Sequence, residues 1–66
     1  MTIAVNGEVR DVAEGTSITA LLESLGLQPE ATVVQHNDEI VDRGQYSEVT
    51  LAPGDILELV RFVGGG

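Results

Sequence analysis

The segment TSITALLESLGL, residues 16–27, contains the signals needed to begin and to end one amphipathic helix. Thr16 and Ser17 belong to the residue types that cap helix N-termini by accepting a hydrogen bond from the first turn. The apolar side chains recur with the spacing of a single helical face: Ile18, Leu21, Leu22 and Leu25. Gly26 stands where a left-handed residue closes a helix, and Leu27 can pack back on the last turn. A helix with one apolar face needs a second apolar surface to cover it, and the flanking sequence should supply that surface.

Two strand-like segments precede the helix: Thr2–Val5 and Glu8–Val12. Asn6-Gly7 lies between them and is the dipeptide that most strongly favours a two-residue hairpin turn. The return strand has a conflict of parity, because Val9 and Val12 would point to opposite faces of a regular strand. Either a bulge lies between these two valines or one of them faces solvent, and the sequence leaves both possibilities open.

Further strands are predicted after the helix: Ala31–His36, Glu39–Val41 and Ile56–Val63. Asn37-Asp38 forms a turn between the first two of these strands, and a Pro-Gly-Asp turn precedes the last. Residues 42–48 are rich in polar and turn-forming types, so we expect irregular structure or one short helical turn there. The order predicts an α+β domain in which one main helix covers one face of a mixed sheet of four to five strands.

The last predicted strand is apolar on both of its faces. If Leu57 and Leu59 face the helix, then Val60 and Phe62 face away from it. Two apolar side chains on an outward face predict a surface for docking partners, to which we also assign Val63; the alternative is a twist that buries Phe62 at the sheet edge. The expected core comes from the helix stripe and from the inward positions of the first and last strands: Ile3, Val5, Leu21, Leu22, Leu25, Leu57 and Leu59.

Composition excludes several kinds of site. The 66 residues allow one domain with a small core, and they include no Cys and one His, so disulfides, thiolate chemistry and multi-histidine metal sites are excluded. A formal net charge of -8 would repel nucleic acid and anionic membranes, which favours a protein partner with a basic surface. The sequence has neither a long apolar run nor the pattern of a signal peptide, so we expect a cytoplasmic protein that does not enter a membrane.

The sequence ends in Gly64-Gly65-Gly66, directly after the last predicted strand. Three glycines with a free carboxylate form a thin arm without side chains, and glycine lets other atoms come close to the backbone. Such an arm suits insertion into the active site of another protein, where the carboxylate itself reacts. The alternative is a frayed terminus or a cloning scar. We therefore divide the chain into a domain at residues 1–63 and a flexible tail at residues 64–66.

Taken together, these features resemble the ThiS family, the small sulfur-carrier proteins of thiamine biosynthesis, which have the ubiquitin-like β-grasp fold. The resemblance extends over essentially the whole chain and is carried by four segments: Ile3–Gly7, Thr16–Leu25, Asn37–Val41 followed by Arg43, and Gly54–Gly66. Four positions depart from the family pattern, which puts partner preference in doubt: His36, Asp38, Asp42 and Tyr46. We assign no chemical role to His36, and the roles of Asp38 and Tyr46 stay open.

The resemblance implies a chemistry for the tail. A ThiF-like (E1-like) adenylating enzyme would use ATP and Mg to activate the Gly66 carboxylate. A sulfur donor protein would then convert it into a thiocarboxylate, which gives its sulfur to thiazole synthase. In this interpretation the chain is a protein cosubstrate and not an enzyme. It binds no cofactor or metal itself, and it is a monomer when free. The alternatives are a sulfur carrier for molybdopterin or another pathway, a ubiquitin-like modifier joined to lysines, and a plain interaction module.

Overall fold

The helix and strands follow one another in the order expected from the sequence. The computed structural model describes residues 1–61, so the predictions for Phe62, Val63 and Gly64–Gly66 lie outside the described residues. The described strands are β1 (Thr2–Val5), β2 (Glu8–Asp11), β3 (Thr32–His36), β4 (Glu39–Ile40) and β5 (Ile56–Arg61). They are accompanied by the helix α1 (Ile18–Ser24) and by two 3-10 turns, η1 (Pro29–Ala31) and η2 (Arg43–Gln45).

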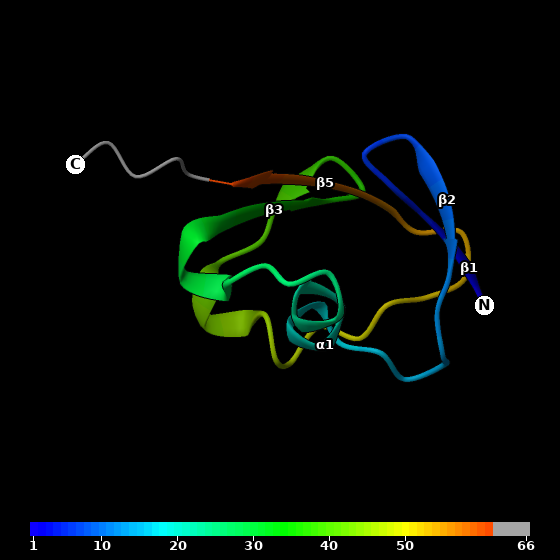
Figure 1. Ribbon diagram of the computed structural model, residues 1–66, viewed down its shortest axis with the longest axis horizontal. Helices are drawn as coiled ribbons and strands as arrows, with labels where there is room; N and C mark the ends of the chain where they lie inside the picture. The colour runs from blue at the N-terminus through cyan, green and yellow to red at the C-terminus, as the bar shows by residue number, and fades with distance from the viewer. Residues whose placement is uncertain (62–66) are drawn as a thin grey trace.

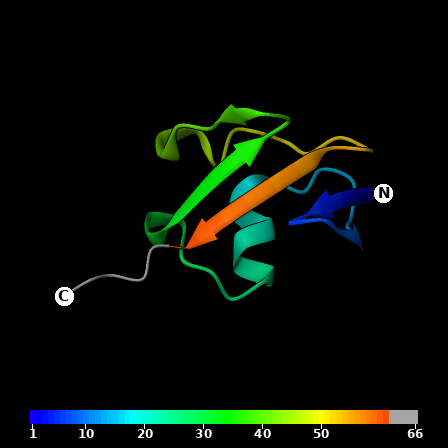
Figure 2. The same ribbon diagram turned by 90° about the horizontal axis from the view of Figure 1, so that it is seen from above.

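The described residues form one 5-stranded mixed sheet with the strand order β2-β1-β5-β3-β4. The first and last strands, β1 and β5, are parallel neighbours, and the other pairs are antiparallel. The helix α1 lies against one face of this sheet, as Figures 1 and 2 show from two directions. The predicted α+β architecture, with one main helix on one face of a mixed sheet, is confirmed.

Both ends of α1 have the predicted geometry. At the N-terminus, the hydroxyl oxygen of Ser17 accepts a hydrogen bond of 3.1 Å from the backbone N–H of Ala20. At the C-terminus, Gly26 has a φ of 74°. The N–H of Leu27 donates to the carbonyl of Leu22 at 2.9 Å, which completes the closing motif expected from the sequence.

Two hairpin turns have positive φ at both central residues, as type I′ turns require. In the first turn, Asn6 has a φ of 51° and Gly7 a φ of 81°. In the second, Asn37 has a φ of 50° and Asp38 a φ of 70°. Asn and Asp are among the few residues other than glycine that adopt this conformation at low cost. Asp38 therefore occupies a turn position where glycine would also fit.

The conflict between Val9 and Val12 is settled without a bulge. Pairing of β1 with β2 runs in a regular register from Thr2 opposite Asp11 to Val5 opposite Glu8. Val9 is 77% exposed on the solvent side of this hairpin. Val12 follows the end of β2 and packs against the core in a partly buried position.

The core lies between α1 and the sheet and contains most of the expected side chains. Its buried apolar members are Ile3, Val5, Ile18, Leu21, Leu22, Val34, Tyr46, Leu51 and Leu57. Leu25 and Leu59, which we expected inside, are only partly buried at its rim. The unexpected member Tyr46 follows the η2 turn, and its hydroxyl donates to the Thr32 carbonyl at 2.8 Å. The polar stretch around η2 therefore contributes a buried aromatic ring.

Truncation of two leucines should separate the centre of the core from its rim. Leu22 is fully buried, so Leu22→Ala should lower the free energy of unfolding by about 2–5 kcal/mol. Leu59 keeps part of its surface in water, and Leu59→Ala should cost less than about 2 kcal/mol. Chemical denaturation followed by circular dichroism measures both values. Equal losses in the two variants would show that the assignment of centre and rim is wrong.

Candidate functional site

The strand β5 is the part of the described chain that leads toward the glycine tail. It lies at the centre of the sheet, between β1 and β3. It ends at Arg61, the last described residue, at the tip of the β5 arrow in Figures 1 and 2. The predicted site residues Phe62, Val63 and Gly64–Gly66 follow this point and lie outside the described residues. The geometry of β5 therefore sets where the described chain ends.

Side chains of β5 alternate between the two faces of the sheet as predicted. Leu57 is fully buried beneath the sheet, against the core that includes α1. Val60 has the opposite parity and is 59% exposed. The predicted outward orientation of Val60 is therefore confirmed, whereas its role in docking stays a prediction.

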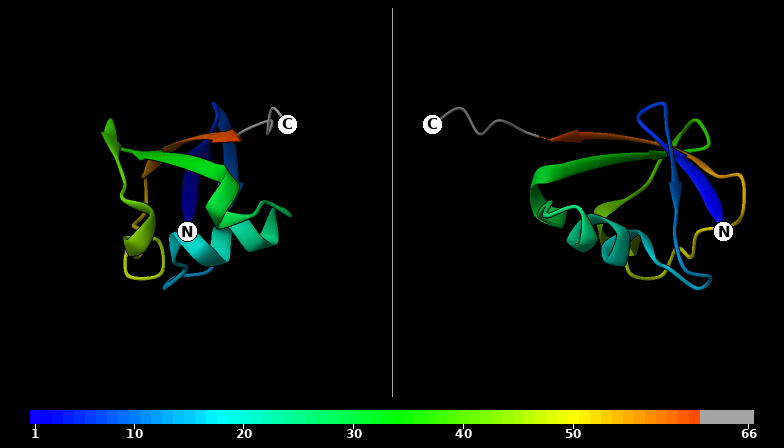
Figure 3. Two further views of the ribbon diagram at one scale, coloured as in Figure 1. Left: turned by 90° about the vertical axis from the view of Figure 1, so that its left-hand side faces the viewer. Right: turned by 45° about the vertical axis from the view of Figure 1, so that its right-hand side comes forward.

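An apolar group of side chains lies on the sheet face opposite α1, which we call the outer face. The large exposed apolar residues of the described chain are Val9, Ile40, Ile56 and Val60. Residues that pair directly across neighbouring strands point to the same face of the sheet. The direct partners of these four residues are Ala4, Gln35 and Val33, and each of these partners follows or precedes a buried residue in its own strand. All four exposed residues therefore lie on the outer face. In the described chain no helix covers the outer face (Figure 3). It is the surface on which a partner could meet the tail-bearing strand.

Two asparagines hold the backbone of β5 from opposite sides. On the β1 side, the N–H of Leu59 donates to Oδ1 of Asn6 at 2.8 Å, and Nδ2 of Asn6 donates to the Leu59 carbonyl at 3.3 Å. On the β3 side, the N–H of Ile56 donates to Oδ1 of Asn37 at 2.8 Å. The asparagines that form the two hairpin turns thus also bind the start and the later part of β5.

A buried carboxylate fixes the turn that precedes β5. Asp55 is 7% exposed, and its Oδ2 lies 2.7 Å from Nε2 of His36 and accepts the Ala52 N–H at 2.8 Å. Its Oδ1 accepts Nδ2 of Asn37 at 3.2 Å. His36, to which we assigned no chemical role, therefore has a structural one, since it ties β3 to the start of β5.

The environment of Asp55 lowers the pKa of its carboxyl. Burial by itself raises this pKa, because it disfavours the charged form. Hydrogen bonds from His36, from the Ala52 amide and from Asn37 favour the carboxylate, and together they outweigh burial, so the pKa lies below its ordinary value. In the sequence, the contact between His36 and Asp55 was indicated only by the position of His36 in its strand, where alternation directs the side chain toward the core. This position does not identify Asp55 as the partner.

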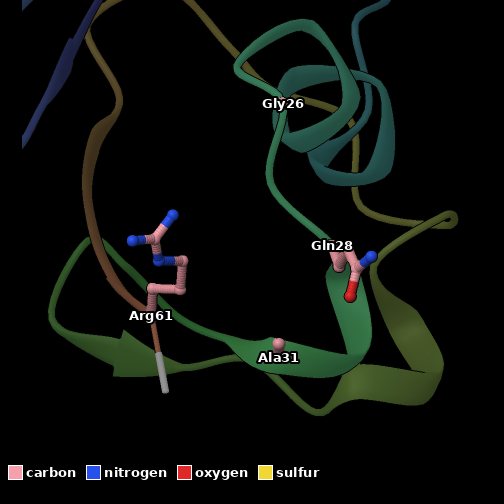
Figure 4. A pocket seen from close by; sticks show the side chains of 4 residues that line it. All are labelled: Gly26, Gln28, Ala31 and Arg61. Atoms are coloured by element: carbon pink, nitrogen blue, oxygen red, sulfur yellow. The ribbon is translucent and has the colours of Figure 1, made fainter. Parts of the chain in front are cut away.

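A hollow of about 310 Å³ lies on the α1 side of the sheet, next to the end of β5. It is lined by Gly26, Gln28, Ala31 and Arg61. Figure 4 shows the Arg61 side chain extending into the space between β5 and the loop that carries Gly26 and Gln28. In a chain with 11 acidic residues and 3 arginines, this places one of the few cations where the described strand ends.

Comparison with known proteins agrees with this geometry. The model of the ThiS family matches residues 3–66. The chain belongs to the ThiS family. A Bacillus subtilis protein named sulfur carrier protein ThiS is 37% identical over 65 residues, which are 97% of this chain and 98% of the relative. A crystal structure of the thiamine biosynthesis protein ThiS from Geobacter metallireducens has a TM-score of 0.84 and 36% identity, with 100% of each chain covered. The fold is therefore the ubiquitin-like β-grasp expected of this family.

Other relatives of this ThiS-family chain are longer proteins. A thiazole synthase from Magnetococcus marinus is 42% identical over 66 residues, which are 100% of this chain and 20% of that protein. A thiazole synthase from Paramagnetospirillum magneticum is 39% identical over the same share of its length. The chain thus spans about one fifth of the length of these curated relatives.

The buried carboxylate predicts how stability depends on pH. Since folding lowers the pKa of Asp55, its contribution is complete above the unfolded pKa of about 3.9 and is lost as pH falls through the lower folded pKa. We expect Asp55→Asn to lower the free energy of unfolding by about 1–3 kcal/mol at neutral pH. The difference from the wild type should shrink below pH ~4. Urea denaturation between pH 7 and pH 2 measures this.

Asp42→Asn is the matched control, because Asp42 is exposed and makes no side-chain capping bond at η2. It removes the same charge without breaking a buried network. An equal loss of stability in both variants would assign the effect to net charge instead of to the contacts of Asp55.

Proposed function

We propose that this ThiS-family chain is the sulfur carrier that supplies sulfur for the thiazole ring of thiamine. The observation that carries the proposal is the family match, which extends through the terminal glycines to residue 66. The relative named sulfur carrier protein ThiS supports it, because it aligns over nearly the whole of both chains. This function requires a form of the protein that ends at Gly66. The carboxylate of that residue is then the reacting group.

Adenylation overcomes the low reactivity of a carboxylate toward nucleophiles. An oxygen of the Gly66 carboxylate attacks the α-phosphorus of ATP on an adenylating enzyme, which releases pyrophosphate and forms an acyl-adenylate. A donor that delivers sulfur at the oxidation level of sulfide then attacks the acyl carbon and expels AMP. The product is a thiocarboxylate, whose sulfur is a nucleophile for the enzyme that builds the thiazole. ATP and Mg belong to the adenylating partner, and the carrier supplies no catalytic residue, so it is a cosubstrate and not an enzyme.

The narrow tail and the outer face have separate parts in this proposal. Gly64 and Gly65 have no side chains that would obstruct a narrow active site. Val60, together with Phe62 and Val63, would contact the partner and hold the tail at its entrance. Ile56 and Val60, the large exposed apolar residues of β5 on the outer face, provide the surface that such contacts need. The net charge of -8 favours a partner whose docking surface is basic.

We assign three partner proteins to the carrier: a ThiF-like adenylating enzyme, a sulfur donor protein and thiazole synthase. The relatives that carry a matching segment within a longer thiazole synthase support the last of these. We further propose that the free carrier is a cytoplasmic monomer. In the part of the chain that the structure describes, no helix has the length and apolarity to cross a bilayer.

Mass spectrometry of the protein purified from its own cells tests the carrier function. We expect a fraction of the chain to have one oxygen replaced by sulfur. Fragmentation should place that sulfur on Gly66, because the proposed mechanism adenylates the terminal carboxylate. Gly66 deletion, with the chain ending at Gly65, provides the control and should abolish transfer to thiazole synthase.

The same experiment distinguishes the competing functions. Adducts between Gly66 and lysines of other proteins would instead identify a ubiquitin-like modifier. The sulfur on Gly66 could also be consumed by molybdopterin synthesis and not by thiazole synthesis. That result would identify a carrier of another pathway. An unmodified terminus under conditions of active thiamine synthesis would contradict the proposal.

The docking role of the outer face is tested by a pair of valines. Val60→Asp places a charge next to the described end of β5, and we expect it to weaken binding to the adenylating enzyme by about 2 kcal/mol or more, the scale for burying one valine. Val9→Asp is the matched control, since Val9 lies on the same face but on the edge strand β2. Isothermal titration calorimetry measures both affinities.

Both valines are exposed, at 59% for Val60 and 77% for Val9, so either variant should change the free energy of unfolding by less than about 1 kcal/mol. An equal loss of affinity in the two variants would show that added negative charge acts at long range. Unchanged affinity in Val60→Asp would remove this residue from the interface.

A further inference from the structure

The Asn6 side chain continues the sheet beyond the point at which β1 ends. The backbone pairing of β1 with β5 reaches Val5 opposite Leu57, and the N–H of Asn6 donates to the Leu57 carbonyl at 2.9 Å. The side chain then reaches two residues farther along β5. Its Oδ1 accepts the Leu59 N–H at 2.8 Å, and its Nδ2 donates to the Leu59 carbonyl at 3.3 Å. One side-chain amide thus replaces the carbonyl and the N–H that two successive partners in a continued parallel strand would offer.

This replacement is needed because the chain reverses direction at the same point. Asn6 has a φ of 51° and begins the turn that leads into β2, so β1 cannot follow β5 any farther. The other edge of β5 is paired with β3 as far as Thr32 opposite Arg61. Beyond Leu57, the edge of β5 on the β1 side is therefore held by the Asn6 side chain, within the described residues.

We propose that Asn6 is a positioning residue for the tail. Its two hydrogen bonds to Leu59 fix the direction of the last described residues of β5, up to Arg61, before a partner binds. This inference rests on the proposed carrier function and adds to it a residue outside the tail and the outer face.

The role has a kinetic signature. Loss of the side chain lets the end of β5 adopt other directions, and only the fraction with the correct direction binds productively. The apparent affinity falls by that fraction, whereas the bound complex is unchanged. The KM for the carrier should therefore rise while kcat stays the same.

Asn6→Gly is the informative variant, because glycine accepts the positive φ of the turn while the amide is lost. We expect the KM for the carrier, measured as pyrophosphate release by the adenylating enzyme with Mg-ATP, to rise about two- to tenfold, the range that one net hydrogen bond controls. Hydrogen exchange of the Leu59 amide should accelerate by a similar factor. Exchange of the Leu21 amide in α1 should not change.

Asn37→Gly is the matched control. It makes the same change in the other type I′ turn and also removes two side-chain hydrogen bonds, one from the Ile56 N–H at the opposite end of β5 and one to Oδ1 of Asp55. With all variants assayed well below their unfolding midpoints, KM should stay at the wild-type value. Asn6→Asp keeps an acceptor for the Leu59 N–H and tolerates the turn, so it should restore most of the amide protection and of the KM.

The outcomes separate this inference from the proposed function. An equal rise of KM in Asn6→Gly and Asn37→Gly would assign the effect to global stability and overturn the role of Asn6. Unchanged KM or unchanged Leu59 exchange in Asn6→Gly would overturn it as well. A wild-type chain that the adenylating enzyme does not turn over would instead overturn the carrier function, and the exchange of Leu59 would still report on the Asn6 contact.

Discussion

The pairing of β5 with strands on both of its edges is the constraint on which the rest of the structure depends. It brings the beginning and the end of the described chain together, because β5 lies parallel to β1 and antiparallel to β3. Without it the two hairpins would be separate units, and α1 would have no continuous surface to cover. The same pairing decides that Leu57 enters the core while Val60 faces outward.

Polar side chains complete this arrangement where the strands themselves end. Asn6 and Asn37 act on opposite edges of β5, and Asp55 fixes the turn before it. Within residues 1–61, every buried side-chain nitrogen and oxygen has a hydrogen-bond partner. In so small a domain this matters, because a buried polar group without a partner costs about 1–3 kcal/mol of stability. The whole core of such a domain supplies only about 3–5 kcal/mol.

The features that could be predicted from the sequence are those encoded by neighbouring residues. The capping Ser17, the closing Gly26 and the turn at Asn6-Gly7 each act over a few positions, and each has its expected conformation. The parity of β5 was also predictable, since a strand alternates with a period of two.

The features that were missed depend on residues far apart in the sequence. Tyr46 is buried in the core with its hydroxyl bonded to the Thr32 carbonyl, and its polar neighbours in the sequence gave no sign of this. His36 meets Asp55 across a separation of 19 residues, and Asn6 meets Leu59 across 53. Such contacts exist only once the sheet order is known, so periodicity alone could not find them.

The ends of the strand order have a consequence for self-association. Exposed edge strands offer unpaired backbone groups to other copies of a chain, and charged or very short edges discourage such pairing. Here β2 carries Glu8, Arg10 and Asp11 on one edge, and β4 on the other is only 2 residues long. The apolar side chains of the sheet are thus presented on a face and not along an edge. The domain can therefore present an exposed apolar surface to partners. Its edges at the same time disfavour the continuous sheets between copies of a chain that are found in fibrils.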